Sequence, residues 1–178
     1  MDTATPTWTI RPTHPDHAAG IIALMRATIA EPVNNLMSEP GEFTLTVEQE
    51  RTFLAEQMIR PDWAGFVATL NDAPGQVIGS IMANGKGRRA IRHRAAVGLA
   101  VARDWRGKGV GRALMERVIA WARETGFITR LELEALVRNE SAVRLYERLG
   151  FQREGLQRHA LLRNGEYLDD LIMALLLD

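Results

Sequence analysis

The sequence predicts a single α/β domain over residues 1–178, with a central mixed sheet of about seven strands and about four helices on both faces. The length of 178 residues fits one domain. Segments typical of strands alternate with segments of helical period. Hairpin signals lie at both ends of the chain, and a strand–helix–strand crossover lies in the middle. Hydrophobic residues make up 46% of the chain, which is enough for a sizeable core.

The N-terminal third predicts a strand, a helix and a loop. Weak alternation over Thr5–Arg11 indicates the first strand. Apolar residues at helical spacing predict a helix over Asp16–Ala30, and Thr13 is the expected cap. Prolines, asparagines and a glycine predict that Glu31–Phe43 is a loop.

A second helix and a hairpin follow. The helix is expected over Thr46–Arg60, because a Thr-x-x-Gln capping box opens it and a proline follows it. Phe66–Leu70 and Gln76–Ala83 are typical of strands, and Asn71–Gly75 provides the turn between them.

The middle of the chain predicts the crossover. Lys86–Arg94 is basic and without apolar period, so an exposed connection is expected. The apolar run Ala95–Val101 is typical of a strand buried on both faces. An amphipathic helix over Ala113–Glu124 and a strand over Ile128–Val137 complete the unit.

The C-terminal part predicts one more helix and a second hairpin. The helix is expected over Ser141–Leu149, with Asn139 as its N-cap and a glycine as its stop. Strands over Phe151–Leu162 and Glu166–Leu177 are joined by Asn-Gly, a strong hairpin signal.

Composition excludes several classes of protein. Lysine plus arginine equals aspartate plus glutamate at 22 each, which argues against a general nucleic-acid surface. The absence of cysteine removes disulfides, thiolate metal sites and cysteine nucleophiles. Met1–Pro6 lacks the features of a signal peptide, and the longest strongly apolar run, Leu171–Leu177, is too short to span a membrane. We therefore expect a soluble, cytoplasmic protein without nucleic-acid or membrane partners.

The segment Arg106-Gly107-Lys108-Gly109-Val110-Gly111-Arg112 lies between a strand and a helix. Its glycines allow a ligand close to the backbone, and the free amides of the helix start favour a phosphate or pyrophosphate. The alternative is a glycine turn with solvated basic side chains. A P-loop and a dinucleotide fingerprint fit poorly, because the spacing of the glycines and the lysine differs.

A second segment completes a recognisable pattern. Arg106-x-x-Gly109-x-Gly111 is followed, after a helix, by Asn139-x-x-Ala142-x-x-x-Tyr146 and then Leu-Gly-Phe at 149–151. In this order and spacing the motifs resemble those of the GNAT superfamily of acetyl-CoA-dependent N-acetyltransferases. The resemblance is strong over residues 95–151 and weak elsewhere. Ala135 departs from it, since the family often has a larger β-branched residue there.

The resemblance implies a sheet splayed in its middle, with acetyl-CoA between the strand ending near Val101 and the strand Ile128–Val137. The pantetheine would pair with the backbone of the first strand, and the pyrophosphate would rest on the glycine segment. The cofactor-binding residues so implied are Leu99, Ala100, Val101, Arg106, Gly107, Lys108, Gly109, Val110, Gly111, Arg112, Asn139 and Tyr146.

The candidate catalytic residues are a tyrosine and two glutamates. The resemblance places Tyr146 near the thioester sulfur as general acid, although its helical spacing also fits a core residue. Glu134 and Glu42 are the candidate bases. Glu132 and Glu134 both alternate with leucines, and any half-exposed strand shows this pattern. No metal is expected, because His14-x-x-His17 has no further ligands in view.

The function expected is acetyl transfer from acetyl-CoA to a primary amine by direct attack in a ternary complex. A small-molecule acceptor is favoured, because the C-terminal stretch resembles that of small-molecule members. A protein-amine acetyltransferase, a non-catalytic acyl-CoA sensor and a nucleotide-phosphate domain stay open as alternatives. The apolar final strand would permit a homodimer.

Overall fold

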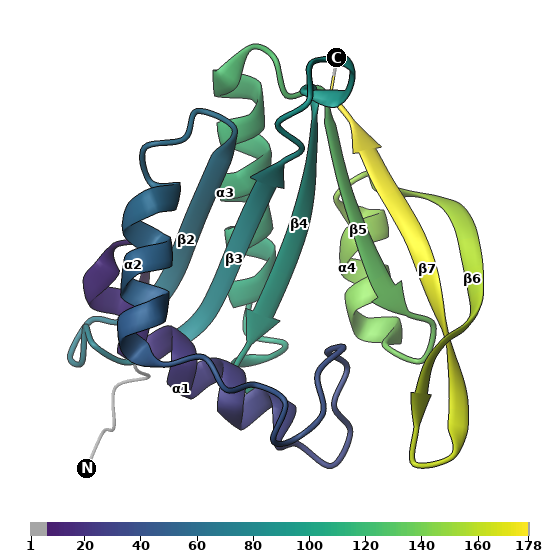
Figure 1. Ribbon diagram of the computed structural model, residues 1–178, viewed down its shortest axis with the longest axis horizontal. Coiled ribbons are helices and arrows are strands. Elements are labelled where there is room, and N and C mark those ends of the chain that lie inside the picture. Colours follow the sequence, from purple (N-terminus) through teal and green to yellow (C-terminus); the bar gives the residue numbers. More distant parts are fainter. Residues whose placement is uncertain (1–6, 178) are drawn as a thin grey trace.

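The computed structural model describes residues 7–177 and shows one seven-stranded mixed sheet flanked by four α-helices (Figure 1). The strand order is β1-β2-β3-β4-β5-β7-β6. The strands are β1 (Trp8–Pro12), β2 (Trp63–Leu70), β3 (Val77–Gly85), β4 (Arg94–Val101), β5 (Arg130–Leu136), β6 (Gln152–Arg163) and β7 (Glu166–Leu176). The helices are α1 (Ala18–Ile29), α2 (Val47–Gln57), α3 (Val110–Thr125) and α4 (Glu140–Arg148).

The helices cover both faces of the sheet, which confirms the expected fold class. Helices α1 and α2 lie on one face, and α3 and α4 lie on the other (Figure 1). Each face has its own apolar cluster. The larger one joins α3 and α4 to the sheet through Leu114, Val118 and Tyr146, and the smaller one joins α1 and α2 through Ile21 and Leu54.

The structure confirms the sequence signals that involve only a few neighbouring residues. Thr46 caps α2 through Gln49, as the capping box predicts. Asn164 and Gly165 both adopt positive φ angles, 51° and 80°, in the turn of the C-terminal hairpin. This turn conformation suits the Asn-Gly pair, because both residues tolerate the left-handed region.

The expected cap of the first helix is wrong. A short 3-10 turn over Pro15–His17 precedes α1, and His14 caps it in a reciprocal pair with His17. Thr13 is instead only 2% exposed, and its backbone amide donates to Gly65. The expected first strand is present over Trp8–Pro12, and its expected start at Thr5 lies outside the described residues.

The expectation that strand β4 is buried on both faces is wrong. It pairs with β3 from Ala95 to Val101, but with β5 only at Arg94, Ala95 and Ala96. Beyond these three pairs β4 and β5 diverge, as Figure 1 shows. Gly98 is consequently exposed, and Leu99 is only partly buried. The apolar run therefore lines an opening in the sheet instead of filling the core.

The final strand does not offer a free edge. β7 pairs with β5 on one side and with β6 on the other, and Leu171, Met173 and Ala174 are buried within the chain. Much of the apolar character of this strand therefore serves the core of the chain itself, and the homodimer stays a prediction. Over residues 7–177, no helix is long and apolar enough to cross a membrane.

Candidate active site

A groove of about 1290 Å³ occupies the gap between β4 and β5. The diverging strands form its two long walls. The N-terminus of α3 and one side of α4 close one end, and residues 33 and 35–37 of the α1–α2 loop contribute to the rim. The groove is therefore formed by the segments that the sequence singled out, together with a loop far from them in the chain.

The wall formed by β4 carries unpaired backbone groups. Because β5 leaves β4 after Ala96, the edge of residues 97–101 that faces the groove has no neighbouring strand. Leu99, Ala100 and Val101 all line the groove at this edge. Such an edge can pair with an extended amide-containing ligand as a further strand does.

The glycine segment places free amides at the end of the groove. Gly107 and Gly109 have φ angles of 72° and 84°, which side chains with a β-carbon rarely adopt. Helix α3 begins directly after them at Val110, three residues earlier than expected. Its N-cap is Gly109, which has no side chain to accept from the first amides, so these donors and the helix dipole remain available to an anion.

The basic side chains of this segment have other partners. Arg106 donates to the carbonyl of Val101 at 2.9 Å and forms a two-point ion pair with Glu31 at 2.7 Å. Arg112 pairs with Glu116 at 2.8 Å, and the ammonium of Lys108 lies 5.2 Å from the ring centre of Trp105. The backbone amides, more than these charges, therefore make the segment suitable for a pyrophosphate.

Helix α4 brings two more of the expected residues to the groove. Asn139 occupies the N-cap position, but its side chain does not cap the helix, contrary to the expectation, and it accepts only from Ser141 at 3.3 Å. Tyr146 is 7% exposed, lines the groove and packs on Phe151 with 5.9 Å between ring centres. Burial raises the pKa of Tyr146 to about 12, so its hydroxyl stays protonated at neutral pH.

The three glutamates considered as bases lie in different surroundings. Glu134 is exposed in the groove. Glu42 does not line the groove, and its carboxylate accepts from the backbone amide of Glu39 at 2.7 Å. Glu132 contacts three cationic side chains: Lys86 at 3.0 Å, Arg94 at 2.6 Å and Arg130 at 3.2 Å.

The pKa of Glu132 makes it a poor base. Burial by itself raises this pKa, but the hydrogen bonds from Arg94, Lys86 and Arg130 outweigh burial and lower the pKa to about 2. A carboxylate with so low a pKa has little tendency to take a proton from an amine. Glu132 instead fixes the narrow end of the groove, where β4 and β5 still pair.

This ion cluster predicts a specific acid sensitivity. The folded-state pKa of Glu132 lies below its unfolded value of 4.5, so its contribution to stability is complete above about pH 4.5 and is lost as the pH falls towards 2. We expect Glu132→Gln to lower the free energy of unfolding by about 2 kcal/mol at pH 7, and less at pH 3. Urea unfolding at both pH values measures this, and an equal loss at both would contradict it.

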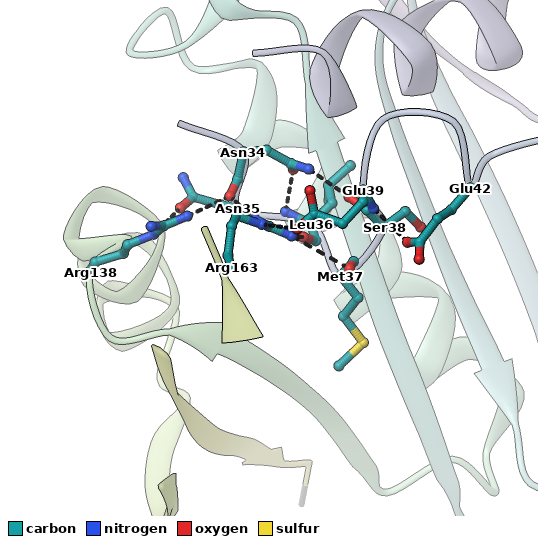
Figure 2. Close-up of polar contacts among 9 residues, drawn as sticks. All are labelled: Asn34, Asn35, Leu36, Met37, Ser38, Glu39, Glu42, Arg138 and Arg163. Carbon is teal, nitrogen blue, oxygen red and sulfur yellow. Dashed lines mark hydrogen bonds and ion pairs between the residues drawn. The ribbon is translucent and has the colours of Figure 1, made fainter. Parts of the chain in front are cut away.

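Sequence reasoning missed the residues that hold the α1–α2 loop over the groove. Figure 2 shows Arg163, at the end of β6, and Arg138, after β5, reaching this loop. Arg163 is 8% exposed. Its guanidinium donates to the carbonyls of Asn34 and Leu36 and pairs with Glu39 at 2.7 Å. These partners are more than 120 residues away in the chain, and no local pattern reveals such contacts.

Most of the expected site residues do meet in the groove. The lining includes Leu99, Ala100, Val101, Arg106, Gly107, Gly109, Gly111, Arg112, Glu134, Asn139 and Tyr146. Lys108 and Val110 do not line it, because Lys108 lies over a tryptophan and the Val110 side chain is buried in the core.

Comparison with known proteins settles the family. The model of the acetyltransferase (GNAT) family matches residues 30–151, which contain both motifs and the whole splayed part of the sheet. The chain belongs to the GNAT family of acetyltransferases. At family level it is an acetyl-CoA-dependent N-acetyltransferase, and the enzyme class expected from the sequence is confirmed.

Relatives of this GNAT protein match over most of its length. The L-amino acid N-acetyltransferase AaaT of Escherichia coli is 30% identical over 148 residues, which cover 81% of this chain and 90% of that protein. A GNAT acetyltransferase from Streptococcus pneumoniae superposes with a TM-score of 0.88 at 27% identity and covers 97% of this chain and all of its own. A phosphinothricin acetyltransferase from Sinorhizobium meliloti, solved with acetyl-CoA, has the same fold, with a TM-score of 0.82 at 22% identity, covering 96% of this chain and 89% of that one.

Proposed function

We propose that this GNAT protein transfers the acetyl group of acetyl-CoA to the primary amine of a small molecule, by direct attack while both substrates are bound. The observation that carries this proposal is the groove through the sheet. Residues on its lining belong to both faces: Tyr146 comes from the α4 side, and Glu134 points to the side of α1 and its loop. Two substrates can therefore meet within it.

The residues fit acetyl-CoA in two respects. The free edge of β4 suits the amides of the pantetheine arm, and the open amides of Gly109, Val110 and Gly111 suit the pyrophosphate. Asn139, which does not cap α4, is free to hold the arm near the helix start. When bound, acetyl-CoA supplies the activated acetyl group.

The chain's own groups supply the remaining chemistry. An amine with a pKa of about 10.4 must lose a proton before it attacks, at a cost of roughly 4–5 kcal/mol at pH 7. Glu134 is the candidate acceptor for that proton, directly or through water, and Glu42 is the less favourable one because it lies outside the lining. An amide of the free β4 edge would stabilise negative charge on the acetyl oxygen. The protonated hydroxyl of Tyr146 would donate to the departing sulfur.

The loop over the groove favours a small acceptor. Arg163 and Arg138 hold residues 34–37 against the C-terminal half of the sheet, which narrows the opening on the α1 side. The name of the relative AaaT, an L-amino acid N-acetyltransferase, supports the same class.

A protein amine is the second candidate. Val33 and Met37 on this loop are 60% and 65% exposed, and both line the groove, so they offer apolar contacts to a larger partner. A ribosomal protein bS18-alanine N-acetyltransferase of Escherichia coli is 38% identical over 77 residues, covering 43% of this chain and 51% of that protein. The homodimer and the cytoplasmic location stay predictions.

Thiol release tests the proposal. The purified chain is mixed with acetyl-CoA and a panel of L-amino acids, alkylamines and N-terminal peptides, and free CoA is measured over time. Amine-dependent release with the small molecules supports the proposal, and release with peptides alone favours the second candidate. Binding of acetyl-CoA without turnover of any amine would favour the sensor module.

The contacts of Arg163 and Arg138 with the α1–α2 loop, here called the loop clamp, give a further prediction. Replacing Arg163 by methionine removes the charged donor group and leaves the carbonyl of Leu36 and the carboxylate of Glu39 without this partner, whereas the carbonyl of Asn34 keeps its bond from Arg138. We expect the free energy of unfolding to fall by about 2–4 kcal/mol and the KM of the amine to rise about tenfold, because the loop no longer holds its place. The dissociation constant of acetyl-CoA should not change. Urea unfolding, steady-state kinetics and calorimetry measure the three quantities.

The controls separate the clamp from a loss of positive charge. Arg158→Met removes an exposed arginine of the same strand and should leave all three quantities unchanged. Arg163→Lys keeps the charge and should restore part of the stability. An unchanged amine KM in a folded Arg163→Met protein would show that the clamp does not shape the acceptor site.

A further inference from the structure

Strand β7 carries a buried carboxylate that the function so far does not use. Asp170 is 3% exposed and lines the groove. Among residues 7–177, no side chain or backbone group forms a hydrogen bond or ion pair with its carboxylate. A buried charge without a partner is costly, so such a group is normally paired, and without a partner its neutral form is favoured until a group of opposite charge binds.

The register of β5 and β7 places Asp170 beside Glu134. Leu136 pairs with Asp170, and Glu134 pairs with Ile172, so these four side chains project from the same face of the sheet. Side chains alternate along a strand, and the intervening residues Leu133, Ala135, Leu171 and Met173 belong instead to the core cluster of α3 and α4. Asp170 and Glu134 thus face the side on which α1 and its loop lie.

We propose that Asp170, together with Glu134, forms the subsite that binds the ammonium group of the acceptor. The inference rests on the proposed function and adds to it the chemistry by which the acceptor is recognised. Tyr146 reaches the groove from the opposite face, so an amine held by the two carboxylates approaches the reacting centre from the side that the hydroxyl does not occupy.

Neighbouring acidic residues show why Asp170 differs. Asp169 points to the other face, where its carboxylate accepts from the backbone amide of His159 at 2.8 Å and holds the bulge of β6. Glu132 is satisfied by three cations. Burial raises the pKa of Asp170, and the charge of Glu134 raises it further. A cation bound between them relieves both effects.

The other residues around Asp170 define the rest of the acceptor. Leu136, Leu161 and Ile172 line the groove next to the carboxylates. These apolar side chains can contact a hydrocarbon group and also strengthen the attraction between the carboxylates and an ammonium by lowering the local dielectric. The class of acceptor that fits is a primary amine with an apolar substituent.

Binding measurements test this subsite without relying on turnover. Calorimetry of the protein saturated with CoA compares n-hexylamine with hexan-1-ol, and L-leucine with L-2-hydroxy-4-methylpentanoate. We expect the wild-type protein to bind an amine at least tenfold more tightly than its hydroxyl analogue. Asp170→Asn should abolish that preference, and Asp170→Glu should restore part of it. Glu166→Gln, which removes an exposed carboxylate from the same strand, should leave the preference unchanged.

Kinetics then distinguish the two proposals. In Asp170→Asn we expect the KM of the amine to rise at least tenfold, while the dissociation constant of acetyl-CoA stays as in the wild type. A preference for the amine that survives Asp170→Asn, or the absence of any such preference in the wild type, overturns the subsite. Failure of the wild type to acetylate any amine, with the ammonium preference intact, overturns the proposed function but not the subsite.

Discussion

Replacing Tyr146 by phenylalanine is expected to lower kcat about 100-fold while leaving the affinity for acetyl-CoA within a factor of two. The hydroxyl is the only group removed, and the ring keeps its contact with Phe151. Because burial raises the pKa of Tyr146 to about 12, the wild-type hydroxyl is a proton donor throughout the neutral range. A thiolate with a pKa near 8.5 is already a fair leaving group, so the loss should lie at the lower end of the 10²–10⁴-fold range of general acid catalysis.

The matched control is Tyr167→Phe, which changes the only other tyrosine of the chain. Tyr167 is 56% exposed and stacks on His159 with 4.1 Å between ring centres, outside the groove. Its loss should leave kcat unchanged. Steady-state thiol release and calorimetry with acetyl-CoA measure both variants, and full activity of Tyr146→Phe would remove the proposed role of the hydroxyl.

Replacing Gly111 by valine is expected to weaken binding of acetyl-CoA by about 10–100-fold. A β-carbon at this position would lie 3.5 Å from the side chain of Leu145 and 3.6 Å from those of Leu99 and Val101, and all three line the groove. The added methyl groups of valine therefore enter the space assigned to the cofactor. Overpacking of this kind costs about 1–3 kcal/mol, and every 1.4 kcal/mol corresponds to a factor of ten in affinity.

Two companion variants isolate the steric effect. Ala113→Val adds a similar bulk two residues further along α3, outside the groove lining, and should bind acetyl-CoA as the wild type does. Gly111→Ala should weaken binding less than valine, yet raise the melting temperature, because alanine favours a helix over glycine by about 1 kcal/mol. Wild-type affinity in a folded Gly111→Val protein would contradict the assignment of this end of the groove.

The sequence predicts well the features that depend on neighbouring residues. The glycines of the α3 loop, the Thr46 capping box and the Asn-Gly turn each act over a few positions, and the structure has all three. The elements between the glycine segment and Tyr146 are α3, β5 and the first turns of α4, and the sequence predicts all three, so this end of the groove could be named in advance.

Features that depend on distant parts of the chain escaped prediction. The apolar run of β4 looks like a buried strand, because nothing in it shows that β5 departs after Ala96. Arg163 finds its partners in a loop about 125 residues earlier, through tertiary contacts alone. Asp170 could have been noticed in the sequence. It shares one face of β7 with the apolar residues Leu168, Ile172 and Ala174, and a carboxylate is unusual among such residues.

The narrow join between the two halves of the sheet has an evolutionary consequence. Only three residue pairs connect β4 to β5, and the ion cluster around Glu132 lies there, at the vertex of the gap. We expect a substitution at the vertex to alter the separation of the two strands while Glu134 and Tyr146 stay in place. Substitutions at the vertex could therefore be selected to accommodate a longer or bulkier acyl donor without any change to the reacting groups.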